Sequence, residues 1–178
     1  IKDVISVLSP DSVLVILCQV PPGFTRSIDF CLEKVFYQVE TLVFGTALER
    51  ALNPERFIVG SLKPEKQLCF PLNSILKTFD APILNMRYES AELAKIAINM
   101  CLVSSISVAN TLAEICEGIG ADWNEIVPAL KLDRRIGKNS YLKPGLGIAG
   151  GNLERDISTV ISLSEEYDTD ACVVRAWR

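Results

Sequence analysis

The sequence predicts an α/β part followed by an all-α part. Short apolar runs alternate with helical segments up to residue 85, one helical pattern runs from 89 to about 120, and no strand pattern follows it. We therefore expect the end of a Rossmann-like parallel sheet domain at 1–85 and a helical domain built on one long helix at 86–178. Three strands are too few for a stable sheet domain, so we expect the other strands upstream of residue 1, in a longer protein.

The elements of the first part follow from the spacing of its apolar residues. A short amphipathic helix at 1–8 ends at Ser9-Pro10. Strands are expected at apolar runs, and helices where the period changes to three or four residues. The expected strands lie at 13–17, 57–59 and 81–84, and the expected helices at 25–36 and 64–79. This alternation is typical of a parallel sheet with helices on its faces.

A long helix at 89–120 is the main feature of the second part. Its apolar residues recur at three- and four-residue steps, and we expect it to be mostly buried. These residues are Leu93, Ile96, Ala97, Met100, Val103, Ile106, Leu112 and Ile115, and Gly118 and Gly120 end the pattern. A shorter helix at 122–132 begins at the cap residue Asp122, a loop covers 138–151, and a last helix covers 155–167.

Composition excludes several functions. The net charge of −4 favours neither nucleic acid nor an anionic membrane as a partner. The apolar run at 13–18 is too short to cross a bilayer and no signal peptide is recognised, so a cytoplasmic location is expected. Six single cysteines without a CxxC pair indicate reduced, buried thiols rather than disulfides or a metal site. Because histidine is absent, catalysis by a histidine of this chain is excluded, as is a metal ligated by one.

Lys95 and Asn99 are the first candidate site residues. They lie four apart on the long apolar helix, so both side chains project from one face. The structural alternative is that Lys95 extends to solvent and Asn99 caps a neighbouring loop. The pattern GLGIAG at 145–150 matches GxGxxG, but no strand precedes it, so we do not interpret it as a dinucleotide fingerprint. Its glycines can still let backbone amides approach a ligand.

Five groups of segments, in order, cover nearly the whole chain and resemble one family. The segments, each followed by the family pattern that it resembles, are 18–23 (STVPPG), 40–45 with 53–60 (PEFLxEG and P-x-R-x-x-x-G), 91–99 (AELxKxxxN), 120–122 with 133–137 (GAD and D-x-RIG) and 144–156 (PGxGxGGSCFPKD). The chain therefore resembles the nucleotide-sugar dehydrogenases, the UDP-glucose and GDP-mannose dehydrogenase family. One such match is weak, but this ordered set is specific.

The resemblance implies an architecture and a reaction. Family members have a Rossmann domain, a central helical domain whose long helix forms a dimer, and a nucleotide-binding domain. This chain would hold the end of the first and most of the second, and would form a homodimer through the helix at 89–118. The implied reaction is two hydride transfers from a sugar C6 alcohol to the cofactor NAD, through an aldehyde and a thioester. The product is a uronic acid for polysaccharide biosynthesis.

The resemblance also assigns the site residues. Lys95 and Asn99 would stabilise an oxyanion, and Glu40 and Asp156 match the family's carboxylates that activate water and move protons. The substrate-binding positions are Leu42, Arg135, Tyr141, Lys143 and Gly147, and Arg135 would reach the sugar of the neighbouring subunit. The cofactor-binding positions are Gln19, Val20, Pro21 and Glu40.

The departures from the family pattern concern the nucleophile most of all. Asn152 stands where the family has its catalytic cysteine, and an amide can form neither the thiohemiacetal nor the thioester. Gln19 replaces the threonine of the STVPPG turn, and Thr41 and Phe44 replace residues of PEFLxEG.

Three hypotheses follow. The chain belongs to an oxidoreductase that makes one hydride transfer or hydrates the aldehyde with water, as the Lys-x-x-x-Asn spacing of thiol-independent β-hydroxyacid dehydrogenases suggests. Alternatively it belongs to an inactive nucleotide-sugar-binding or regulatory homologue, or it is a helical dimerisation module. Single residues keep structural alternatives: Asp156 as a helix cap, Arg135 as a solvated charge, and Glu40 as an exposed loop acid.

Overall fold

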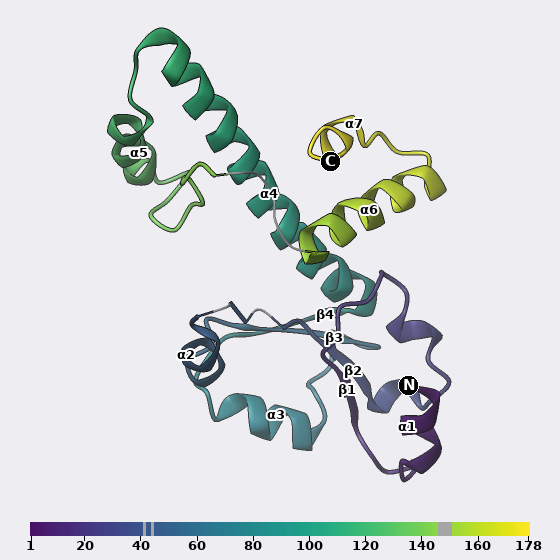
Figure 1. The fold of residues 1–178 in the computed structure, drawn as a ribbon. Coiled ribbons are helices and arrows are strands. Elements are labelled where there is room, and N and C mark those ends of the chain that lie inside the picture. The colour runs from purple at the N-terminus through teal and green to yellow at the C-terminus, as the bar shows by residue number, and fades with distance from the viewer. Residues whose placement is uncertain (41, 44, 146–150) are drawn as a thin grey trace. The chain divides into compact units, whose positions relative to one another are not determined.

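The computed structural model describes residues 1–40, 42–43, 45–145 and 151–178, and it confirms the predicted fold class (Figure 1). The chain divides into two compact units, Ile1–Lys95 and Ile96–Arg178. The strands belong to the first unit, and the described part of the second contains helices and loops. The division falls inside the long helix α4, and the boundary expected near Asn85 stays a prediction.

The first unit is built on a four-stranded sheet. Its strands follow the order β1-β2-β3-β4, with β1 at Leu14–Ile16, β2 at Val35–Gln38, β3 at Phe57–Ser61 and β4 at Ile83–Arg87. β1 pairs parallel with β2 and β3 parallel with β4, but β2 and β3 are antiparallel. The sheet is therefore mostly parallel, with one reversal between its middle strands. Among the described residues between these two strands, the one helix is the six-residue α2 (Ala47–Leu52). Strand β3 starts at the edge of the sheet where β2 ends.

Two predicted helices of the first unit need correction. The segment 25–36 contains two single-turn 3-10 helices, η1 (Thr25–Ser27) and η2 (Leu32–Lys34), and leads into strand β2. Three consecutive residues of that strand are buried, so it lacks the alternating pattern that identifies a half-exposed strand. The helix expected at 64–79 covers only α3 (Phe70–Lys77), because Pro71 fits the first helical turn and marks a start.

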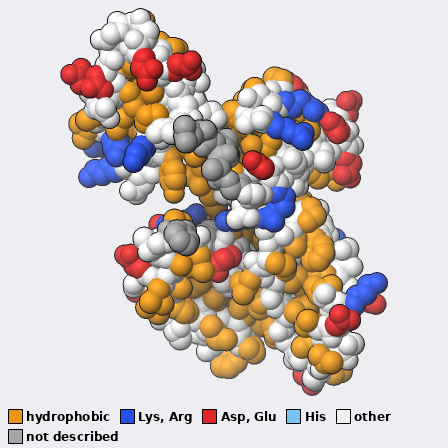
Figure 2. Space-filling view, in the orientation of Figure 1, with side chains coloured by type: hydrophobic (Ala, Val, Ile, Leu, Met, Phe, Trp, Pro, Cys, Tyr) orange, Lys and Arg blue, Asp and Glu red, His pale blue; other side chains and the backbone are white. Residues whose placement is uncertain are grey.

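The core of the first unit lies between the sheet and α3. Leu72 and Leu76 of α3 pack with Phe36 and Val59 of the sheet, and Leu68 completes the cluster. Helix α1 (Lys2–Val7) precedes β1 and buries none of its residues. Figure 2 shows many hydrophobic side chains on the drawn face of this unit.

The second unit packs its helices along the later part of α4 (Tyr88–Ile119). Its other helices are α5 (Trp123–Leu132), α6 (Gly151–Glu166) and α7 (Cys172–Arg175). Val103 packs against Ile157 and Ile161 of α6, while Ala109 and Cys116 pack with Trp123. The Asp122 carboxylate accepts the Asn124 N–H at 2.8 Å, so the predicted cap of the helix at 122–132 is confirmed.

Helix α4 is less buried than its apolar sequence predicts. Ile96 and Val103 are buried, but Leu93, Leu112 and Ile115 are 40–49% exposed. By length and composition alone α4 is long and apolar enough to cross a membrane, a test that the core helix of a soluble protein also passes. The six cysteines are free thiols, as predicted, but their expected burial is wrong, because Cys116 alone among them is buried.

Candidate functional site

A buried amide–carboxylate pair is the centre of the second unit's candidate site. Asn99 of α4 donates from Nδ2 to Asp156 Oδ2 of α6 at 2.5 Å, and both side chains are buried. Because a carboxylate oxygen accepts, the bond requires the NH2 end of the amide to face Asp156. The structure thus joins two of the predicted site residues, which lie 57 positions apart. The amide nitrogen has a second N–H group with which it can donate to an oxyanion.

Asn152 lies in the first turn of α6, one turn before Asp156. It is exposed, and its Oδ1 accepts a hydrogen bond from Arg155 Nη2 at 3.2 Å. Asn152, where the resemblance predicts the family's nucleophile, therefore lies at an accessible helix N-terminus beside a guanidinium group. These surroundings would favour a thiolate, but an amide has no such ionised form.

The loop after α5 presents two predicted substrate residues. Leu142 is buried, and its carbonyl accepts the Trp123 Nε1–H at 2.8 Å. This anchor leaves the flanking Tyr141 and Lys143 side chains exposed on the wall of a cavity of about 450 Å³. Lys131 and Lys138 also line it, so the cavity has basic and aromatic groups suited to an anionic ligand. Figure 2 shows Lys and Arg side chains gathered over α5 and this loop.

Arg135 is a strongly exposed cation held by a local carboxylate. Its Nη2 lies 2.6 Å from Asp133 Oδ2, and its backbone N–H donates to Asp133 Oδ1. The ion pair lowers the pKa of Asp133 and raises that of Arg135. No contact found in the described part of the chain joins Arg135 to Asn99 or Asp156.

The glycine-rich loop is tied to α4 at its first glycine. The Gly145 N–H donates to Asn110 Oδ1 at 2.9 Å. The rest of the loop, including the predicted substrate residue Gly147, lies outside the described residues.

The first unit places the predicted cofactor residues in the turn that follows β1. Val20 is buried, Gln19 is half-buried and Pro21 is exposed. Gly23 has a φ of +93°, which glycine adopts without strain. Ligands of α/β proteins bind beyond the carboxyl ends of parallel strands, where this turn lies. The position and accessibility of the turn therefore fit a dinucleotide.

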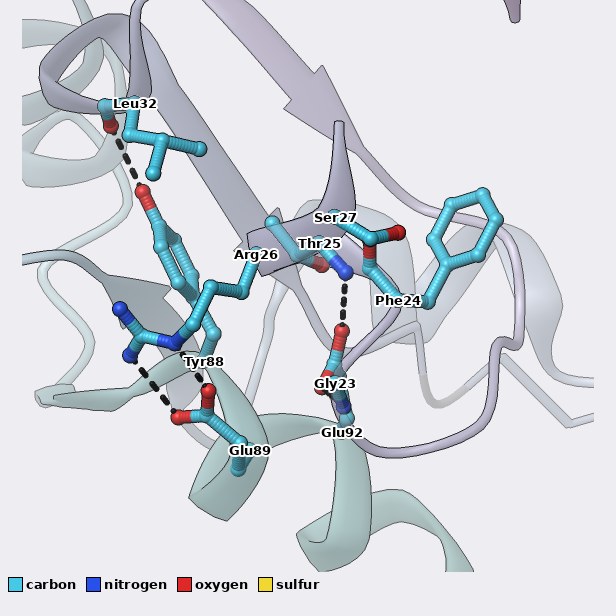
Figure 3. A network of polar contacts seen from close by, with 9 residues as sticks. All are labelled: Gly23, Phe24, Thr25, Arg26, Ser27, Leu32, Tyr88, Glu89 and Glu92. Carbon is cyan, nitrogen blue, oxygen red and sulfur yellow. Dashed lines mark hydrogen bonds and ion pairs between the residues drawn. The ribbon is translucent and has the colours of Figure 1, made fainter. Parts of the chain in front are cut away.

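The carboxylate of Glu92 holds this turn from inside (Figure 3). The side chain is fully buried, and its two oxygens accept the Gly23 N–H at 2.6 Å and the Thr25 N–H at 2.7 Å. Among the described residues, Thr25 Oγ1 is the only buried side-chain nitrogen or oxygen without a hydrogen-bond partner.

Two further residues in the first turn of α4 contact the part of the chain that follows this turn (Figure 3). The Tyr88 hydroxyl oxygen lies 2.7 Å from the carbonyl oxygen of Leu32 and 2.8 Å from that of Val35, and its single proton can be donated to either. Burial raises the Tyr88 pKa to about 12. Glu89 forms an exposed ion pair with Arg26, which lowers the pKa of Glu89 and raises that of Arg26.

The remaining predicted residues of the first unit are more exposed. Glu40 is exposed and accepts the backbone N–H of Leu42, itself exposed, at 3.0 Å. Lys95 is half-buried on α4, three residues after Glu92 and four before Asn99. In the described part of the chain, no group of three His, Cys, Asp or Glu side chains could hold a metal ion.

Sequence reasoning missed Glu92, the most buried carboxylate of the first unit. The signal was present, because an acidic residue one turn before Lys95 stands on the helix face that also carries the buried Ala91 and Ile96.

The geometry defines the end of a Rossmann-like domain whose last strand runs directly into the long helix of a helical domain. The central-domain model of the UDP-glucose/GDP-mannose dehydrogenase family matches residues 89–178. The chain belongs to this family.

Comparisons with individual proteins support the same family. The UDP-glucose 6-dehydrogenase of Rickettsia typhi is 30% identical over 95% of this chain and 40% of its own length, and that of Rattus norvegicus is 33% identical over 82% and 30%. A solved UDP-glucose dehydrogenase of the archaeon Pyrobaculum islandicum has a TM-score of 0.81 and 29% identity, covering 93% of this chain and 40% of that one. The chain thus spans about two fifths or less of these relatives.

Proposed function

We propose that the whole protein containing this chain is an NAD-dependent oxidoreductase that oxidises the C6 alcohol of a UDP- or GDP-sugar. The observation that supports this proposal most is the buried hydrogen bond from Asn99, on the helix that also carries Lys95, to Asp156 of α6. A buried amide held toward a carboxylate, one turn from a lysine, provides a donor, a cation and a proton acceptor for alcohol oxidation.

The roles of these groups follow from the charge that develops. Loss of the alcohol proton produces an alkoxide, which the Lys95 ammonium and the Asn99 N–H stabilise. Asp156 orients Asn99, and Asp156 or Glu40 accepts protons. NAD, when bound, supplies the hydride acceptor, and Gln19, Val20, Pro21 and Glu40 would hold it beyond the end of β1.

The nucleotide sugar would lie against the basic wall of the loop after α5. We assign Tyr141 and Lys143 to its binding on the basis of the cavity that they line, and Leu42, Arg135 and Gly147 on the basis of the family pattern. An exposed Arg135 is compatible with a role toward a neighbouring subunit. We further propose a cytoplasmic homodimer that acts in polysaccharide biosynthesis.

Asn152 limits the chemistry in this proposal. Without a thiol no thioester forms, so oxidation stops at the aldehyde, or at its hydrate, after one hydride transfer. The second candidate is a homologue that binds the nucleotide sugar without turnover, and the same observation, an amide at the nucleophile position, favours it.

The proposal is tested by counting NADH formed per nucleotide sugar consumed by the whole protein. The wild type is expected to form one equivalent. The variant Asn152→Cys, whose thiol would lie in the first turn of α6 beside Arg155, is expected to approach two. Two equivalents from the wild type would contradict the limit set by Asn152. No NADH from a wild type that still binds UDP-glucose would support the inactive homologue instead.

A control variant distinguishes the effect of a thiol at position 152 from the effect of replacing the asparagine. Asn152→Ser keeps a small polar side chain in the same turn but offers no thiolate. It is expected to form one equivalent of NADH, as the wild type does.

A further inference from the structure

Glu92 connects the two parts of the first unit that the proposed function uses. It lies one turn before Lys95 on α4, and its carboxylate accepts the N–H groups of Gly23 and Thr25 in the turn after β1. Figure 3 shows its side chain directed from the helix toward this turn. Helix and turn are 67 to 69 residues apart in sequence.

The complete burial of the Glu92 carboxylate is unusual. Glutamate is rarely fully buried, because desolvation of its charge costs several kcal/mol unless hydrogen bonds compensate for it. Two short bonds from N–H groups are the compensation found here. A serine or asparagine side chain could accept one such N–H group without the cost of a buried charge. A carboxylate that accepts two N–H groups fixes both of them, so we infer that Glu92 makes the turn rigid.

Part of the turn is open to solvent. Pro21 is exposed, Gly23 has no atom within 4 Å of the position of a Cβ, and the buried Thr25 hydroxyl has no partner among the described residues. Arg26, the residue after the turn, also contacts α4, through its exposed ion pair with Glu89 and through its guanidinium carbon, 5.4 Å from the centroid of the Tyr88 ring. Exposed ion pairs contribute little to stability, because solvent screens their charges. Glu92 is the fully buried charged side chain that ties this turn to α4.

We propose that Glu92 is a positioning residue that holds the turn at 19–25 in register with Lys95, so that the dinucleotide and the sugar alcohol meet in one geometry. This inference rests on the proposed function, since it assigns the turn to the dinucleotide. Glu92 does not touch a reactant in this account. It acts through the backbone of the turn.

The test compares Glu92→Gln, Glu92→Asp and Glu89→Gln in the whole protein, by the NADH dissociation constant measured from NADH fluorescence. In Glu92→Gln one acceptor oxygen becomes an NH2 group that faces a backbone N–H. We expect NADH to bind about tenfold more weakly, the effect of one lost hydrogen bond to a charged group. Glu92→Asp keeps the charge and should lose less. The matched control Glu89→Gln removes only the exposed ion pair and should bind NADH as the wild type does.

A second measurement reports on the turn without any ligand. Hydrogen exchange of the Gly23 and Thr25 amides should be faster in Glu92→Gln than in the wild type, while exchange in the α6 helix stays unchanged. The dissociation constant for UDP-glucose is the control for the rest of the fold, and it should stay unchanged in Glu92→Gln. Partial unfolding of the variant would lower the number of binding sites but not the affinity of the sites that remain.

The outcomes separate the inference from the proposed function. If the wild type binds NADH and the Glu92→Gln constant is unchanged, or if Glu89→Gln weakens binding equally, the inference is wrong. If Glu92→Gln does not fold, Glu92→Asp decides: faster amide exchange with weaker NADH binding supports the inference, and wild-type binding overturns it. A wild type that binds no NADH overturns the proposed function, and the inference with it.

Discussion

Tyr88 shows how one polar atom can hold a buried aromatic residue in place. Its ring is fully buried at the start of α4, and its hydroxyl is within hydrogen-bond distance of two carbonyls of the segment before β2. Burial opposes ionisation, which raises the Tyr88 pKa from its usual 10 to about 12.

The variant Tyr88→Phe is expected to lower the free energy of unfolding by about 1 kcal/mol at neutral pH, the usual contribution of one hydrogen bond. Because the folded pKa is above the unfolded value, the stabilisation by the neutral phenol is complete below pH 10 and is lost between about pH 10 and 12. Urea unfolding of the whole protein at pH 7, 9, 10.5 and 11.5 measures the difference between the two forms. It should be constant up to pH 9 and decrease at the two higher values; a constant difference at every pH would contradict this account.

The contact between Asn99 and Asp156 could not be predicted from the spacing of residues in the sequence. Lys95 and Asn99 share a helix face by spacing alone, but nothing in the spacing indicates that Asn99 contacts Asp156. That contact depends on the packing of α6 against α4, and only the family pattern pointed to Asp156. The functional roles of these residues stay predictions.

At the scale of elements, strand β3 packs closely against the start of α4. A Cβ built on Gly60 would lie 3.0 Å from Ala91 Cβ and 3.1 Å from the backbone of Tyr88. Neither neighbour is the end of a flexible side chain, so the helix would have to move away from the sheet to accommodate a methyl group.

Gly60→Ala is therefore expected to destabilise the protein by roughly 1–3 kcal/mol, as overpacking usually does. Gly118→Ala is the matched control, because that glycine lies in α4 with nothing within 4 Å of its Cβ position. It should be neutral or stabilising by up to about 1 kcal/mol, the helix propensity difference. Thermal unfolding of both variants measures the contrast, and a Gly60→Ala protein as stable as the wild type would show that β3 and α4 are less closely packed.

Elements with long periodic patterns could be predicted, and short buried ones could not. The expected helix at 89–120 differs from α4 by one residue at each end, because its period persists over 32 residues. Strand β2 was missed because its buried run of three residues follows apolar residues at helical spacing. The reversed direction of β3 is equally invisible in the sequence, since an apolar run does not encode which way the strand points.

At the scale of the whole molecule, an exposed apolar stripe on α4 needs a partner. Val108, Leu112, Ile115 and Ile119 are 40–73% exposed and follow one another at steps of four, three and four, so they lie on one helix face. The transfer of one such side chain out of water contributes about 1.5–3 kcal/mol, which makes a continuous stripe suited to a protein partner.

We expect that partner to be a second copy of the protein, and the whole protein to be a dimer by light scattering. The double variant Leu112→Glu with Ile115→Glu places two charges in the stripe, and desolvation of those charges should reduce the mass to that of the monomer. Val173→Glu is the matched control, because Val173 of α7 is equally exposed but lies off the stripe. A wild type that is monomeric, or a double variant that stays dimeric, would exclude this face as the interface. A wild type that sediments with membranes would instead assign the stripe to lipid, which the apolar length of α4 also permits.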